Sequence, residues 1–192
     1  MRAARTATPV SAAAPQPPTS ASLDDPAGDL TSLEGAAVAG PAHLDALRVE
    51  ASVDGETLFV TLRLASGPPS GVDGSVEQMT YLIVIDTDGP EDMDYWVTAE
   101  NRSSGNFAFT LTDWADSYTY DTDTGDYPGA GAIADDTILW RLPLDALGSP
   151  SRLRISIWAQ LSVDFEPVAE DFVPDGGPDL SGDPVGWLVV LP

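Results

Sequence analysis

The stretch MTYLIVIDTDGPEDMDYWV, Met79 to Val97, decides the fold of this chain. Residues Thr80 to Ile85 form a short apolar run, rich in β-branched side chains and without charge, which predicts a strand buried on both faces. The run ends in Asp86 and Asp88, whose carboxylates are costly to bury without partners. The chain is therefore expected to turn here, to place both groups at the edge of a sheet, facing water or a cation, and to return as a strand from Asp94.

The flanking segments repeat this pattern of short strands separated by turns. Asp54 and Gly55 supply a hairpin turn, and apolar and polar residues alternate strictly from Thr57 to Ala65. The sequence PLDALG, Pro143 to Gly148, predicts one helical turn ended by glycine. Further strands are expected over residues 44–52, 94–101, 106–112, 138–142, 153–161 and 185–191, with loops over 113–128 and 164–183. This pattern predicts an all-β fold, an antiparallel β-sandwich of immunoglobulin-like or jelly-roll type.

Length and composition favour a single domain. The chain has 192 residues, 43% of them hydrophobic, which is enough for one sizeable core. Residues 1–22 are rich in Ala, Pro, Ser and Thr and are predicted to be a disordered tail or linker, with the sandwich domain over 23–192. The tail has no apolar core typical of an intact secretory signal, and no apolar run approaches the ~20 residues that a membrane helix needs.

The charge is strongly negative and restricts the partners. Thirty-one acidic residues stand against eight arginines, and the net charge is −23. Such a chain repels phosphate backbones and anionic lipids, so we expect no nucleic-acid partner and no membrane insertion. Cations, neutral polymers and copies of the chain remain as partners. The acidity fits calcium loops, a high-salt habitat or a surface kept soluble by charge.

Three acidic clusters are candidate calcium sites, because calcium takes six to eight oxygen ligands from carboxylates and carbonyls on tightly turned backbone. The first cluster precedes the hairpin, the second follows the organising strand, and the third has alternating acids beside a glycine. Their candidate ligands are Asp24, Asp25 and Asp29; Asp86, Asp88 and Asp94; and Asp121, Asp123 and Asp126. A solvated acidic surface is the competing interpretation of each cluster.

Aromatic residues supply candidate platforms for a sugar ring. Stacking on a pyranose needs an exposed aromatic face with polar groups around it. The polar segment after residue 112 contains four such residues, and we take them as the candidate ligand-binding set: Trp114, Tyr118, Tyr120 and Tyr127. Trp140, Trp158 and Trp187 lie in apolar strands and are predicted to belong to the core. Trp96 fits either role.

Catalytic chemistry finds little support in the sequence. No cysteine is present, so thiol catalysis and disulfides are excluded. The lone His43 excludes any mechanism that needs two histidines. Asp123, Thr124 and Gly125 match the Asp-Thr-Gly of aspartic proteases, but they lie among acids and do not follow an apolar strand. Paired carboxylates suited to glycoside hydrolysis are compatible with so acidic a chain, without any one pair standing out.

Five signatures occur in a characteristic order along residues 23–192. They are DPAGD at Asp25–Asp29, Leu44 and Asp45 ahead of the hairpin, VIDTD at Val84–Asp88 with Asp94 and Tyr95, LPLDALG at Leu142–Gly148, and DFVPDGG at Asp171–Gly177. In this order they resemble the DOMON-like group of secreted β-sandwich domains that includes carbohydrate-binding module family 9. They are similar in particular to the C-terminal modules of glucodextranase-type enzymes. The resemblance implies non-catalytic binding of sugars or other ligands, often with structural calcium.

Together these observations predict a non-enzymatic binding module, extracellular or on the cell surface, that binds a polysaccharide or another neutral ligand and holds structural calcium. Two alternatives stay open. One is a structural subunit of a surface layer, filament or coat, in which sheet edges pair between copies of the chain. The other is a glycoside hydrolase, which would turn over a polysaccharide and depend on one carboxylate pair.

Overall fold

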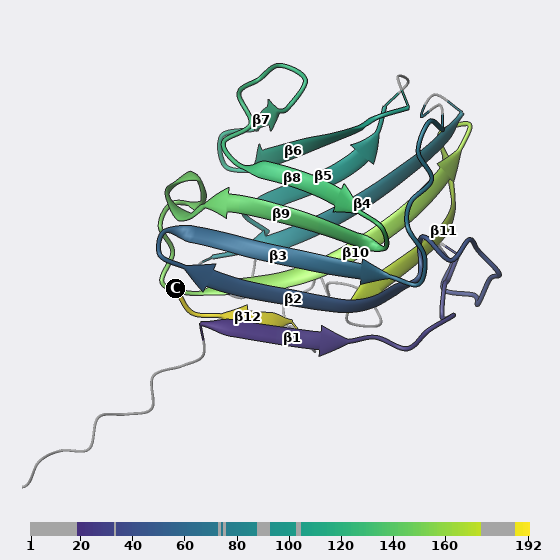
Figure 1. Cartoon of the computed structure of the whole chain (residues 1–192), viewed down its shortest axis with the longest axis horizontal. Helices are drawn as coiled ribbons and strands as arrows, with labels where there is room; N and C mark the ends of the chain where they lie inside the picture. Colours follow the sequence, from purple (N-terminus) through teal and green to yellow (C-terminus); the bar gives the residue numbers. More distant parts are fainter. Residues whose placement is uncertain are drawn as a thin grey trace, which may run out of the picture.

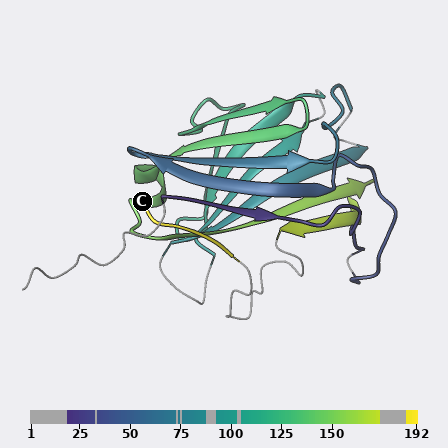
Figure 2. The same cartoon turned by 60° about the horizontal axis from the view of Figure 1, so that its bottom comes forward.

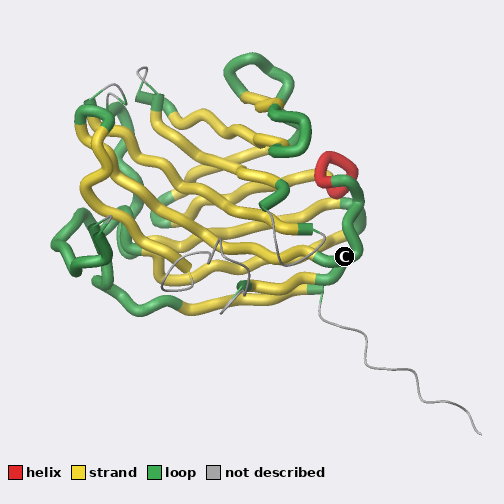
Figure 3. The backbone as a smooth tube through the Cα atoms, turned by 180° about the vertical axis from the view of Figure 1, so that it is seen from behind, coloured by secondary structure: helices red, strands yellow, loops and turns green. Residues whose placement is uncertain are grey.

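The computed structural model describes residues 19–32, 34–72, 74, 76–87, 93–102, 105–173 and 187–192. In this part of the chain, twelve strands form two antiparallel sheets that pack face to face. Figure 1 looks onto the sandwich, and Figure 2 shows its layers turned by 60°. From behind, strands make up most of the coloured tube, and a helical turn lies at one corner (Figure 3). The predicted antiparallel β-sandwich is confirmed.

The two sheets differ in size. Among the described residues, the smaller sheet has the strand order β1-β2-β3-β9-β8 and the larger has the order β11-β10-β4-β5-β6-β7, with β12 also paired to β10. The smaller sheet consists of β1 (Ser20–Asp24), β2 (Ala46–Asp54), β3 (Thr57–Leu64), β9 (Thr137–Pro143) and β8 (Ala130–Ala134). The larger consists of β11 (Glu166–Val173), β10 (Leu153–Val163), β4 (Glu77–Asp86), β5 (Tyr95–Asn101), β6 (Phe107–Asp113), β7 (Tyr118–Asp121) and β12 (Leu188–Val190).

Strand β4 is the centre of the larger sheet, as its sequence predicts. It pairs with β10 on one side and β5 on the other. Tyr81, Ile83 and Ile85 are fully buried between the sheets, while Leu82 and Val84 are buried on the opposite, outer face. A strand buried on both faces needs apolar residues at every position, which explains the unbroken apolar run. At its end Asp86 is buried in an ion pair with Arg154, so its expected exposure at the sheet edge is wrong.

The hairpin of β2 and β3 is also confirmed, and it supplies much of the core from the smaller sheet. The inward side chains of β3 are fully buried, as strict alternation requires. Gly55 has φ +59 at the turn, a conformation that favours glycine. The helical turn η1 (Leu144–Leu147) ends at Gly148 with φ +74, as the sequence PLDALG predicts. The inward residues of β3 are Leu58, Val60, Leu62 and Leu64.

Four strands lie in segments where no strand was expected. Strand β1 begins at Ser20, before the expected domain boundary at Leu23. Strands β7 and β8 are short and follow polar or small-residue sequence, and β11 occupies the start of the predicted loop over 164–183. All four lie toward the edges of their sheets, where half-buried strands need few apolar residues. Strands β1 and β12 lie side by side and close one edge of the sandwich (Figure 1).

Candidate functional site

A buried group of carboxylates lies where the two sheets meet near β1 and β11. The loop after β1 supplies Asp25 and Asp29, the residue before β2 is Asp45, and β11 supplies Asp171. Carboxylate oxygens of Asp25, Asp29 and Asp171 lie within 4.8 Å of one another. Asp45 is 7% exposed and Asp171 is 3% exposed. We call these four residues the acidic cluster.

Backbone contacts hold the three segments of the acidic cluster together. Thr31 exchanges two hydrogen bonds with the backbone of Glu170, at 2.9 and 2.8 Å, and so pins the loop after β1 against β11. The N–H of Ala46 donates to Asp171 Oδ2 at 2.7 Å, and the N–H of Gly28 donates to Asp45 Oδ2 at 2.9 Å. Segments more than 120 residues apart in sequence therefore converge on one point.

The electrostatics of the acidic cluster favour a cation. The pKa of Asp171 is raised to about 7, chiefly by burial and also by the negative charges of Asp29 and Asp45, while the hydrogen bonds from the N–H groups of Ala46 and Phe172 lower it. Within the described residues, Asp45 Oδ1 is buried and has no hydrogen-bond partner. Opposite ligand oxygens around calcium lie about 4.8 Å apart, twice a Ca–O distance of about 2.4 Å, and the cluster meets this spacing. Its residues could hold one calcium ion.

The predicted cation ligands have different surroundings. Asp25 and Asp29 lie in the acidic cluster, whereas the neighbouring Asp24 is exposed and forms an ion pair with Arg48. Asp94 Oδ2 accepts hydrogen bonds from the N–H and the hydroxyl group of Thr87. Asp88 lies outside the described residues. The second predicted triplet, Asp86, Asp88 and Asp94, therefore stays a prediction, because one of its three members lies outside the described residues.

The third predicted triplet forms a closed loop of hydrogen bonds after β7. Asp126 Oδ1 accepts from the N–H of Asp121 at 2.9 Å and from the hydroxyl group of Thr124 at 2.6 Å, while its Oδ2 accepts from the hydroxyl group of Tyr118 at 2.9 Å. Asp121 Oδ1 accepts a hydrogen bond from the N–H of Asp123, and Asp121 Oδ2 forms an ion pair with Arg102. These hydrogen bonds lower the pKa of Asp126 to about 2. The loop is thus stabilised by hydrogen bonds from its own N–H and hydroxyl groups.

Sequence reasoning did not assign Asp45 and Asp171 to the cation set. Both lie in quoted signatures, Asp45 directly before the hairpin and Asp171 at the start of DFVPDGG. Asp45 lies between the buried Leu44 and Ala46, and Asp171 lies in a strand with the buried Ala169 and Val173, an arrangement that is costly unless the charge has a partner. That local contrast is a signal that could have found them. Their meeting with Asp25 and Asp29 depends on strand pairing that spacing does not reveal.

Two exposed aromatic residues, Trp114 and Tyr118, lie near the ends of β5, β6 and β7. Trp114 follows β6 and is 46% exposed, and its ring meets that of Trp96 edge-to-face at 4.8 Å. Trp114, Met93, Asp94 and Ala115 line a depression of about 410 Å³. The indole N–H of Trp96 donates to Met93 Sδ at 3.4 Å, and the N–H of Trp114 donates to the backbone oxygen of Asp94 at 3.0 Å. The Trp114 ring is therefore held in place while much of it stays open to solvent.

The three predicted ligand-binding tyrosines are not equivalent. Tyr118 is 49% exposed and meets the half-buried Tyr120 edge-to-face at 4.7 Å. Tyr127 packs against the core, and burial raises its pKa. The structure thus places Trp114 and Tyr118 at the surface, Tyr120 beneath Tyr118, and Tyr127 largely inside.

The other tryptophans correct one part of the sequence analysis. Trp140 is fully buried, as predicted. Trp158 lies half-buried on the outer face of the larger sheet, where it stacks on Phe172 with ring centres 5.5 Å apart, and Arg154 lies over the half-buried ring of Trp187. The core assignment of Trp158 and Trp187 is therefore wrong. Trp158 alternates with the buried Ile157 and Ala159 and shares its face of β10 with Ser156 and Gln160, so strand alternation already indicated the outer face.

Comparisons with known proteins leave the family open. No family model matches the chain, and no curated protein matches it. A crystal structure of a candidate carbohydrate-binding protein from Bacteroides uniformis has a TM-score of 0.36 and 10% sequence identity, and the match covers 77% of this chain and 78% of that chain. Among the described residues, no helix has the length and apolar character needed to cross a bilayer. What the chain does must be inferred from its own geometry, and its DOMON-like resemblance stays a prediction.

Proposed function

We propose that this chain is a non-catalytic carbohydrate-binding module that works outside the cell and holds structural calcium in the acidic cluster. The saccharide site lies around Trp114 and Tyr118, and the calcium ion joins the loop after β1 to β2 and β11. The observation that carries the saccharide assignment is the exposed, immobilised ring of Trp114 beside the carboxylate of Asp94.

The surroundings of Trp114 match the chemistry of a sugar. The face of an aromatic ring stacks on the C–H groups of a pyranose, and carboxylates accept hydrogen bonds from its hydroxyl groups. Burial raises the pKa of Tyr95, and the nearby charges of Asp113, Asp94 and Asp116 also raise it, which puts three acceptors around this end of the larger sheet. A net charge of −23 leaves a neutral polymer as the favoured ligand.

The acidic cluster suits a structural ion and does not suit catalysis. A carboxyl group with a pKa of about 7 would serve as a general acid if substrate could reach it. Asp171 is 3% exposed, and its two oxygens accept from the N–H groups of Ala46 and Phe172. A polymer cannot approach that position. Bound calcium would instead neutralise the buried charges and hold β11 against β2, and extracellular calcium is high enough to fill sites of about 10⁻⁴ to 10⁻³ M affinity.

The saccharide assignment is tested by calorimetric titration of the full chain with five neutral hexaoses: cello-, malto-, isomalto-, xylo- and mannohexaose. We expect at least one of them to bind, and Trp114→Ala to weaken that binding about tenfold, because a stacked aromatic ring contributes about 0.5–1.5 kcal/mol beyond the area that it buries, and about 1.4 kcal/mol is a factor of ten. The control is Phe165→Ala, which removes an exposed aromatic ring from the β10–β11 turn. No Trp114-dependent binding of any hexaose contradicts the assignment, and so does release of shorter sugars on prolonged incubation.

A further inference from the structure

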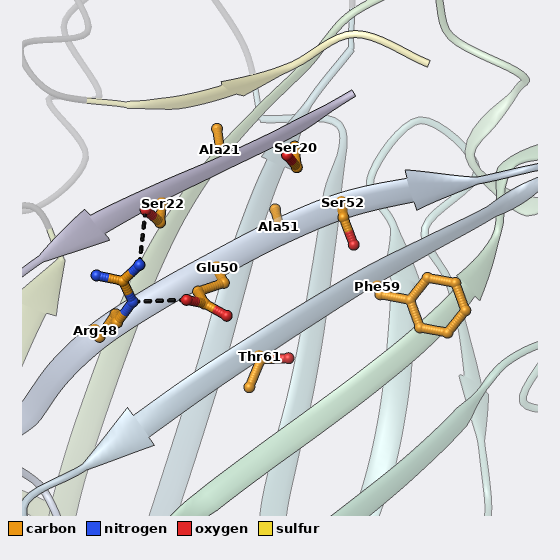
Figure 4. A pocket seen from close by; sticks show the side chains of 9 residues that line it. All are labelled: Ser20, Ala21, Ser22, Arg48, Glu50, Ala51, Ser52, Phe59 and Thr61. Atoms are coloured by element: carbon orange, nitrogen blue, oxygen red, sulfur yellow. Dashed lines mark hydrogen bonds and ion pairs between the residues drawn. The ribbon is translucent and has the colours of Figure 1, made fainter. Parts of the chain in front are cut away.

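A second hollow crosses the outer face of the smaller sheet, away from Trp114. It measures about 510 Å³ and lies over β1, β2 and β3, as Figure 4 shows. Its volume falls within the range of about 300–1,000 Å³ that is typical of small-ligand sites. Four of its nine lining residues carry hydroxyl groups: Ser20, Ser22, Ser52 and Thr61. None of its lining residues belongs to the depression at Trp114.

Strand register explains why the surface is hollow here. Ser20, Ser52 and Phe59 face one another across β1, β2 and β3, and Ser22, Glu50 and Thr61 form the next row. Outward side chains alternate with buried ones along each strand, so both rows lie on one face. The small side chains of these two rows leave a low floor between Glu50 and Phe59. The hollow is therefore a consequence of the sequence pattern on three paired strands.

One wall of the hollow is an ion-pair network with no spare positive charge. Arg48 Nε donates to Glu50 at 2.7 Å, Nη2 donates to Ser22 at 3.1 Å, and Nη1 pairs with Asp24. Figure 4 shows the contacts with Glu50 and Ser22. Two carboxylates on one guanidinium leave the wall acidic, so it does not select an anion. The network does hold the Glu50 carboxylate and the Arg48 N–H groups in fixed positions, ready to bind hydroxyl groups.

The opposite side of the hollow is aromatic. Phe59 is half-buried on β3, and the guanidinium carbon of Arg141 lies 5.7 Å from the centre of its ring. Arg141 is paired with Phe59 across β3 and β9, which fixes this contact by register. The hollow thus combines an apolar ring, a row of small hydroxyl groups and a fixed acceptor. This is the chemistry that recognises a neutral polyhydroxylated ligand.

We propose that this hollow is a second saccharide site, which binds a short stretch of neutral oligosaccharide between Phe59 and the Arg48–Glu50 pair. It goes beyond the proposed function, because it shares no residue with the Trp114 depression and binds whether or not that depression does. With both sites active, one module would hold a polymer at two separate faces. Two linked sites raise the apparent affinity for a long chain well above that for a short one.

The proposal is tested by titrating the ¹⁵N-labelled full chain with the same five hexaoses and following its amide signals by NMR. We expect at least one hexaose to shift the signals of Ser20, Ser22, Ser52 and Thr61 in a saturable manner. Phe59→Ala should weaken this response about tenfold or more. Ser52→Tyr, which fills the hollow without removing a partly buried ring, should abolish it. Circular dichroism of each variant checks that the fold is retained.

Two control variants separate this site from the one at Trp114. Arg63→Gln changes an exposed residue outside the hollow that pairs with Asp136, and it should leave the response within about twofold of wild type. Trp114→Ala should leave the response of the hollow intact. Shifts confined to the Trp114 region overturn the second site and leave the proposed function standing. Absence of any shift in the hollow, or shifts that Phe59→Ala and Ser52→Tyr leave unchanged, also overturn it. Hollow shifts with no Trp114-dependent binding overturn only the Trp114 assignment.

Discussion

Two acidic regions of this molecule resemble each other in sequence and differ in structure. The acidic cluster joins Asp25 and Asp29 to Asp45 and Asp171 from distant segments, and it is largely buried. The loop Asp121–Asp126 has regularly spaced acids next to a glycine and lies at the surface. In the loop, N–H and hydroxyl groups from within a few residues reach the carboxylates. In the cluster, negative charges face one another.

In a chain with 31 acidic residues, the spacing of Asp residues along the sequence is therefore a poor guide to a calcium site. A loop whose own donors satisfy its carboxylates gains little from a cation. A buried group of carboxylates is costly when empty, because each charge has lost its water and is repelled by its neighbours. We therefore expect calcium to act strongly at the acidic cluster and weakly at the loop, and three experiments test this contrast.

The largest effect is expected for calcium on thermal unfolding. An ion at about a hundredfold excess over its dissociation constant adds about 2.7 kcal/mol, which corresponds to a rise in Tm of about 5–10 °C for a domain of this size. Asp171→Asn should lose most of this rise. In chelator at pH 8 the same variant should unfold at a higher temperature than wild type, because it removes a buried charge and keeps an acceptor for the Ala46 N–H. A calcium-induced rise in Tm that is as large in Asp171→Asn as in wild type would contradict calcium binding at the acidic cluster.

A smaller effect is expected from pH in the absence of calcium. The pKa of Asp171 is raised from 3.8 to about 7 in the folded protein, so between those values the folded state keeps a proton that the unfolded chain has lost. This contribution to stability is complete below about pH 4 and is lost as the pH rises to 7. The Tm of wild type, measured relative to Asp171→Asn in chelator, should therefore fall from pH 4 to pH 8. A Tm difference that does not change with pH would show that the pKa of Asp171 is not raised in the folded protein.

The smallest effect is expected in the loop. Asp126→Asn should lower the Tm by no more than a few degrees, equally with calcium and with chelator, because it weakens hydrogen bonds within the loop. The pKa of Asp126 is lowered to about 2, so the difference from wild type should be present above about pH 4 and disappear as the pH falls to 2. Asp123→Asn is the matched control. A lower Tm in either variant that appears only with calcium would place the cation site in the loop.

The sequence predicts the centre of the fold well and its edges poorly. The apolar run of β4, the alternation of β3 and the PLDALG turn each depend on local chemistry, and each is confirmed. Strands β1, β7, β8 and β11 have weak local patterns, and their existence depends on pairing with neighbours. Local signals therefore suffice where the strand is buried, and they fail where tertiary pairing decides.

The candidate sites likewise differ in how far local sequence could predict them. The exposure of Trp114 follows from its place in a polar segment, and the sequence could suggest it. The meeting of Asp25 and Asp29 with Asp171 could not be predicted, because it joins segments far apart in the chain, and the hollow at Phe59 depends on how β1 pairs with the β2–β3 hairpin. Trp158 was assigned to the core although it alternates with the buried Ile157 and Ala159, and that alternation places it on the outer face of β10.

Calorimetric titration of calcium into the chelator-treated full chain tests the acidic cluster most directly. We predict one calcium ion per chain at this site, with binding abolished in Asp171→Asn and in Asp29→Asn and retained in Asp123→Asn. Absence of calcium binding to wild type would contradict the account, as would binding that persists in both cluster variants or is lost in Asp123→Asn.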